Sequence, residues 1–139
     1  MKYRVFGDTI AVRLNRGEEV MAQLKTVCEA EKITAGTLTG IGAADYAVVG
    51  LYEVEKRSYH SNTLKEEMEI TNLTGNISQK DGSLYLHLHA TLADESGKAF
   101  GGHLNEARIS GAGEIFIHRL DGGINRIPDD DTGLNIMDW

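Results

Sequence analysis

Hydrophobic side chains between Glu18 and Lys32 recur with the period of an α-helix. They fall at positions i, i+4, i+7 and i+8 and so share one face: Val20, Leu24, Val27 and Cys28. Glu18 and Glu19 near the start and Lys32 at the end match the polarity of the helix dipole. The pattern predicts one main α-helix over residues 18–32, in which Cys28 is a buried small side chain rather than a reactive thiol.

Apolar and β-branched residues elsewhere gather in runs separated by turns. These runs predict strands at residues 9–14, 37–41, 45–54, 68–78, 84–92 and 109–120. The turns at 79–82 and 94–97 end in glycine, as hairpin turns often do, so the sheet is expected to be mostly antiparallel. Residues 55–67 are polar and weakly patterned, which predicts a loop or an irregular edge of the sheet. No repeat or linker divides the chain, and we predict a single α+β domain over residues 1–139.

The C-terminal tail carries three consecutive acids and then Leu134, Ile136 and Trp139. A tryptophan among apolar residues is expected to pack, either against its own domain or against a neighbouring subunit.

Composition describes a globular protein with many tight turns, with 41% hydrophobic residues and 16 glycines among 139 residues. A chain of this length buries a core without disulfides or a structural metal. Its single cysteine forms no internal disulfide, and no apolar run approaches the roughly 20 residues needed to cross a bilayer. These features favour a cytoplasmic protein with no membrane partner.

Net charge bears on the class of partner. The chain has 14 basic and 21 acidic residues, a net charge of −7, and no run of three basic residues. Because sequence-independent affinity for nucleic acid depends on basic side chains that neutralise phosphates, direct DNA binding is disfavoured.

The stretch LHLHATLADESGKAFGGHL, which begins at Leu86, is the main candidate for chemistry. Side chains alternate along a strand, so His87 and His89 share a face, while the leucines between them face the core. A symmetrical turn at 94–97 places His103 on the opposite face, and a one-residue bulge near Gly101 and Gly102 brings it opposite His89 or His87. Three converging imidazoles suit zinc or another divalent ion with an open coordination position. Strand geometry alone leaves a solvated polar face as the alternative.

Other candidates are weaker. Glu69, Glu106 and Glu114 are candidate acids or bases for a metal-bound water, although each also suits a surface position. His60 lies in the polar segment and His118 alternates with apolar residues near a strand end, and neither is assigned a function. The glycine-rich segments lack the Gly-Lys-Ser/Thr sequence of a phosphate-binding loop.

Motifs along most of the chain resemble one family. LNRGEEV before the helix, TGIGAA, EEMEITNLTGNIS, the histidine stretch and GAGEIFI occur in the order found in the PPC (plant and prokaryote conserved) domain, from about Tyr3 to Leu120. The resemblance implies a mostly antiparallel sheet with a packed helix, assembled as a homotrimer. Stand-alone prokaryotic members with His-x-His followed by Gly-Gly-His can hold a zinc-like metal, and His87, His89 and His103 match that pattern.

The plant members of the family have features that this chain lacks. It has no Arg-Gly-Arg-Pro AT-hook, and of the plant Gly-Arg-Phe-Glu-Ile-Leu motif only Glu69 and Ile70 remain. We therefore favour a metal-binding homotrimer with an unknown small-molecule ligand or reaction. The alternatives are a DNA-binding regulator, as stand-alone members are often labelled, and a metal-independent protein-interaction module.

Overall fold

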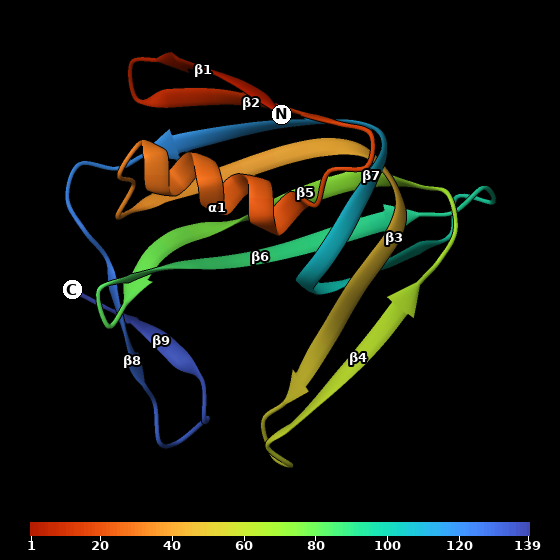
Figure 1. Ribbon diagram of the computed structural model, residues 1–139. Helices are drawn as coiled ribbons and strands as arrows, with labels where there is room; N and C mark the ends of the chain where they lie inside the picture. The colour runs from red at the N-terminus through yellow and green to blue at the C-terminus, as the bar shows by residue number, and fades with distance from the viewer.

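The computed structural model describes residues 1–139, which form one helix and a nine-stranded sheet (Figure 1). The strands are, in chain order, β1 (Lys2–Phe6), β2 (Thr9–Asn15), β3 (Gly36–Glu53), β4 (Ser58–Leu64), β5 (Met68–Lys80), β6 (Ser83–Ala93), β7 (Ala99–Arg119), β8 (Asn125–Pro128) and β9 (Asn135–Asp138). Helix α1 (Val20–Ala30) follows β2. The predicted α+β class, with a mostly antiparallel sheet and one main helix, is confirmed.

The sheet closes on itself in its central part. Its main order is β1-β2-β7-β3-β5-β8-β9, and β6 pairs with both β5 and β7, so that β7, β3, β5 and β6 form a ring. Every pairing is antiparallel except one parallel bridge, which joins Gln79 of β5 to Asn125 of β8. This bridge determines where the C-terminal segment meets the sheet.

Helix α1 covers one face of this sheet with the four apolar side chains that the sequence pattern predicts. Glu19 caps its start, because the carboxylate accepts hydrogen bonds from the backbone N–H groups of Met21 and Ala22 at 2.9 and 2.6 Å. The helix is shorter than predicted. Lys32 lies beyond its end with φ of 53°, and so does not contribute to the last turn.

The core lies between the helix and the inner faces of the strands. Leu88 and Ala90 of β6 are buried in it, and Leu84 and Leu86 pack against it, as the alternation predicted. Cys28 is also buried, and burial raises the pKa of its thiol to about 12. The interpretation of Cys28 as a core side chain is therefore confirmed.

Two of the predicted strands join into one. Residues 37–41 and 45–53 both belong to β3, which continues through the glycines with a shift in its register to β5 between Gly40 and Gly42. The second predicted strand, 45–54, is one residue too long. At Gly42 an added Cβ would lie 2.6 Å from the carbonyl oxygen of Ala112, so glycine is needed for the close approach of β7.

The sequence did not reveal the exposed strands. Of the two alternatives for residues 55–67, the loop is wrong and the edge is right, because the segment contains β4, which pairs with β3 alone. The strands β1, β8 and β9 were not predicted. In β4 only the two end residues are partly buried, and all five residues of β1 are exposed. Strands without a buried face have no hydrophobic alternation, which is the signal that sequence reasoning uses.

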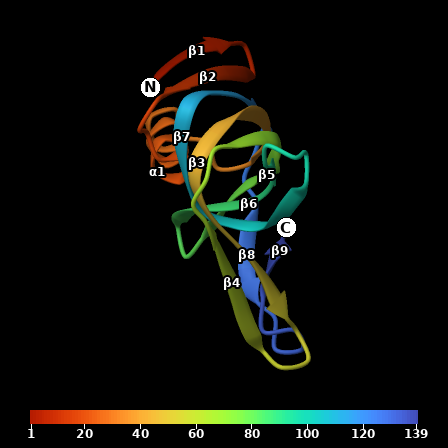
Figure 2. The same ribbon diagram turned by 90° about the vertical axis from the view of Figure 1, so that its right-hand side faces the viewer.

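Two hairpins, β3–β4 and β8–β9, project from the same side of the central body (Figures 1 and 2). Their ends meet where Arg57 donates a hydrogen bond to the backbone oxygen of Asp130 at 2.6 Å. Trp139 is 91% exposed, so its expected packing against its own domain is wrong, and packing against a neighbouring subunit stays a prediction. No helix in the chain has the length and apolar character needed to cross a bilayer.

Candidate metal centre

The hairpin of β6 and β7 aligns the three histidines. His89 lies directly opposite His103, and Ala90 lies opposite Gly102. Of the two partners predicted for His103, the structure has His89. The extra residue lies in the turn rather than in a strand bulge, and the turn is closed by a hydrogen bond from Asp94 N–H to the carbonyl oxygen of Lys98. Directly opposed residues of an antiparallel pair share a face, so His103 joins His87 and His89.

The three imidazole rings form a compact cluster. Ring centroids are 5.2 Å apart for His87 and His89, 5.2 Å for His87 and His103, and 5.6 Å for His89 and His103. One ring nitrogen from each lies within 4.8 Å of the other two. Nitrogen ligands of a tetrahedral zinc ion are about 3.4 Å apart, given zinc–nitrogen bonds near 2.05 Å. Small side-chain rotations would therefore bring all three onto one ion.

The surroundings of the cluster disfavour the protonated forms of His87 and His103. Burial, followed by the charges of His103, Arg126 and His89, lowers the pKa of His87 to about 4. Burial and the charge of His89 also lower the pKa of His103. A metal takes the lone pair of a neutral imidazole, so rings that resist protonation at neutral pH are suitable ligands. The donor set thus fits a first-row divalent ion.

Closely packed glycines bring β3 and the β6–β7 hairpin together beside the histidine cluster. A Cβ on Gly102 would lie 2.5 Å from the carbonyl oxygen of Gly50, so the two backbones meet at this point. A Cβ on Gly50 would in turn collide with the hydroxyl of Tyr59, which also accepts a hydrogen bond from the side chain of Asn105. Tyr59 is thereby held with its ring 6.3 Å from that of His103.

A pocket of about 630 Å³ opens over the cluster, and we call it the histidine pocket. It lies between the sheet and the two projecting hairpins. Its lining combines the imidazoles with polar, aromatic and aliphatic residues: Gly50, Leu51, Tyr52, Tyr59, Asn76, Tyr85, His87, His89, His103, Arg126, Leu134, Asn135, Ile136 and Met137.

The sequence profile of the Plants and Prokaryotes Conserved (PCC) domain matches residues 1–121. The chain belongs to the PCC domain family. This is the family that the sequence motifs resemble, named PPC (plant and prokaryote conserved) above, and the resemblance is confirmed.

Solved structures share the fold of this PCC domain over nearly its whole length. A candidate DNA-binding protein from Bacteroides thetaiotaomicron is 36% identical with a TM-score of 0.96, covering 99% of this chain and 96% of that one. A metal-containing protein from Archaeoglobus fulgidus is 35% identical with a TM-score of 0.88, covering 97% and 95% of the two chains.

A curated relative of this PCC domain is a far longer protein. The bifunctional protein GlmU from Synechococcus sp. is 29% identical over 125 residues, which are 88% of this chain and 19% of that protein. The chain thus spans about a fifth of the length of this relative.

The other sequence candidates of the PCC domain lie apart from the histidine pocket. Glu69 and Glu106 are exposed and do not line it, and the same holds for Glu114. Their acid/base role stays a prediction. His60 is exposed on β4, where its Nε2 lies 3.0 Å from a carboxylate oxygen of Glu53.

Among the residues of the histidine pocket that sequence reasoning missed is its one basic side chain besides the histidines, Arg126. It lies on β8, is 7% exposed, and its Nη2 is 3.5 Å from Nδ1 of His87. Its guanidinium also lies 4.7 Å from the ring centroid of Tyr85. The surrounding sequence has no pattern that places it there, because the parallel bridge of β8 to β5 is a long-range contact.

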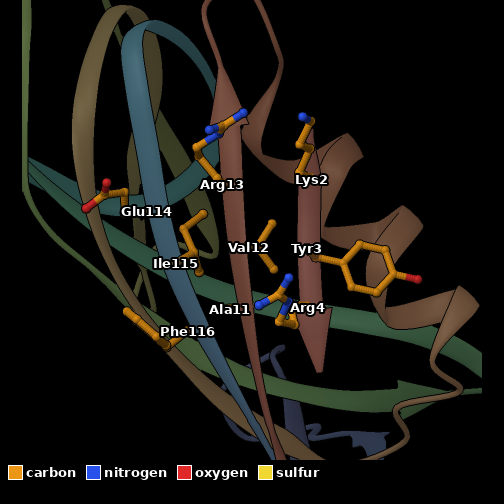
Figure 3. A pocket seen from close by; sticks show the side chains of 9 residues that line it. All are labelled: Lys2, Tyr3, Arg4, Ala11, Val12, Arg13, Glu114, Ile115 and Phe116. Atoms are coloured by element: carbon orange, nitrogen blue, oxygen red, sulfur yellow. The ribbon is translucent and has the colours of Figure 1, made fainter. Parts of the chain in front are cut away.

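A second hollow, of about 490 Å³, lies along β1, β2 and β7, and we call it the outer groove (Figure 3). The strand registers place six of its side chains on the face opposite the core: Lys2, Arg4, Ala11, Arg13, Glu114 and Phe116. Phe116 is 52% exposed. Of these two hollows, only the histidine pocket contains clustered metal-ligating groups.

Proposed function

We propose that this PCC-domain protein is a homotrimer that binds a divalent metal ion, of the zinc class, through His87, His89 and His103. The observation that carries the proposal is the direct pairing of His89 with His103, which brings three imidazoles together at the floor of a pocket. The metal-containing relative of the same fold supports it. An ion held by three protein ligands keeps a coordination position open for water or a small-molecule ligand.

The homotrimer is supported by apolar residues on the outer face. Phe116 lies opposite Ala11 of β2 and Thr39 of β3, and Phe6 and Ile41 are each more than half exposed nearby on β1 and β3. Clustered exposed apolar side chains are typical of surfaces that contact another protein. We propose that a second copy of the chain covers this face.

Elemental analysis of protein purified after growth with added zinc tests the metal site. We expect about one metal ion per chain in the wild type and less than about a tenth of that in His89→Ala, because two imidazoles bind far more weakly than three. His118→Ala is the matched control, since His118 lies on β7 away from the cluster and should leave the metal content unchanged. A metal-free wild type would contradict the proposal.

DNA association is the second candidate function. It is favoured by Lys2, Arg4 and Arg13, which gather at the outer groove, and by the relatives described as candidate DNA-binding proteins. The net charge of −7 opposes it. Binding to duplex DNA that weakens with salt and is lost in Arg4→Gln/Arg13→Gln would establish this function. An absence of binding at low salt would reject it.

A further inference from the structure

Arg126 is a buried cation without an acidic partner. It is 7% exposed, yet none of the ion pairs in the molecule includes it. Removing a charge from water is costly unless an opposite charge or strong hydrogen bonds compensate. Arg126 is also the only charged residue of the chain that is buried.

Neutral acceptors hold the guanidinium in place. Nε donates to the hydroxyl of Ser78 at 2.8 Å, Nη1 to the backbone oxygen of Asn135 at 2.6 Å, and Nη2 to the side-chain oxygen of Asn76 at 2.7 Å. The contact of Nη2 with His87, at 3.5 Å, is at the limit of a hydrogen bond. A guanidinium has five N–H groups, so these contacts leave one strong donor position on each Nη for another acceptor.

The position of this charge points to the kind of ligand. The guanidinium contacts His87, so a metal ion on the histidines and Arg126 would place two positive centres side by side. An anion between them is attracted to both and offsets their repulsion. A carboxylate suits this place, since its two oxygens match the donor geometry of an arginine and also bind divalent metals. A phosphate is less suited, because the pocket supplies only this one basic side chain.

The walls of the histidine pocket define the rest of the ligand. Aromatic rings of Tyr52, Tyr59 and Tyr85 and aliphatic side chains of Leu51 and Ile136 line the space around the polar floor. Such a lining favours an apolar body attached to the charged group.

We propose that the histidine pocket binds a small organic carboxylate with an apolar or aromatic body, whose carboxylate lies between Arg126 and the ion on the three histidines. The contact with the ion rests on the proposed function above, whereas the contact with Arg126 does not.

Calorimetric titration with benzoate and with its neutral analogue benzamide, at pH 7.5, tests the inference. We expect benzoate to bind the zinc-loaded wild type at least about tenfold more tightly than benzamide, and to keep a preference over benzamide after the metal has been removed by a chelator. Arg126→Gln should weaken benzoate binding by about 10- to 100-fold and leave benzamide binding unchanged. Arg126→Lys keeps the charge but loses the planar guanidinium, so its affinity for benzoate should lie between those of the wild type and Arg126→Gln.

Arg16→Gln is the control, because Arg16 is exposed in the turn after β2 and does not line the pocket. Equal affinity for benzoate and benzamide in the wild type would overturn the inference, and this comparison needs no variant to fold. Unchanged benzoate binding in folded Arg126→Gln would also overturn it. Zinc binding without a preference for benzoate would retain the metal site and reject the carboxylate. An Arg126-dependent preference in protein that binds no zinc would retain the carboxylate and reject the metal.

Discussion

The histidine pocket and the outer groove both combine basic with aromatic side chains, but they differ in how the positive charge is accommodated. In the outer groove Arg13 lies opposite Glu114 in the strand register, and Lys2, Arg4 and Arg13 are exposed to water. In the histidine pocket Arg126 is buried among neutral acceptors. Exposed cations are solvated and need no partner, whereas a buried cation is stabilised by an anion. Burial, rather than residue type, therefore separates a ligand site from an association surface.

The largest effect that separates the two hollows should come from Phe116→Asp. A carboxylate at this position would remove the aromatic contact and bring a charge into the proposed contact between subunits, so we expect dissociation of the trimer and a threefold fall in mass. Light scattering coupled to size-exclusion chromatography measures this, and the zinc content should not change.

Val54→Asp is the control for this substitution, since Val54 is an exposed apolar residue in the turn after β3 and does not line the outer groove. A trimer that persists in Phe116→Asp would show that the outer face is not the contact between subunits. A fall in mass in both variants would show that the effect is not specific to the outer face.

A smaller effect is expected from Gly102→Ala, which tests whether close backbone contact builds the histidine pocket. The added methyl group would lie 2.5 Å from the carbonyl oxygen of Gly50, so β3 and β7 must separate next to His103. We expect a loss of about 1–3 kcal/mol of unfolding free energy, measured with urea, together with weaker zinc binding.

Gly111→Ala is the matched control for Gly102→Ala on the same strand. Its methyl group would meet only the Cβ of Ala43, at an ordinary contact distance of 3.6 Å. If both variants were equally stable, the close approach at Gly102 would not hold the site together.

The smallest effect should be a dependence of stability on pH in metal-free protein. The pKa of His87 is about 4 in the folded chain, because of burial and nearby charges, and 6.5 in its unperturbed state. The unfolded chain therefore binds more protons between these values, so stability is complete above pH 6.5 and decreases as the pH falls towards 4. Urea midpoints across this range should fall, and should fall less in His87→Gln. An equal slope in His87→Gln would contradict this account, and His118→Ala should keep the wild-type slope.

The sequence could predict the features that depend on local pattern. The alternation of leucine and histidine in β6 predicted both the core face and the shared face of His87 and His89. His89 was one of the two partners predicted for His103, although the additional residue proved to lie in the turn rather than in the strand. Helix α1 was predictable because it has one apolar face.

The features that the sequence could not predict depend on exposed strands and long-range contacts. β1 and β4 have almost no buried side chains and hence no hydrophobic alternation. Arg126 reaches the pocket only because β8 pairs with β5 through the bridge between Asn125 and Gln79. These two residues are far apart in the sequence. Register between distant segments is not encoded in any short stretch of residues, so this part of the site emerged only from the structure.

X-ray absorption at the zinc edge of the loaded protein tests the central claim most directly. The account predicts three imidazole nitrogen ligands at about 2.0–2.1 Å with oxygen completing the coordination, and loss of this spectrum in His103→Ala. A coordination shell of oxygen atoms alone, or a spectrum unchanged in His103→Ala, would contradict it.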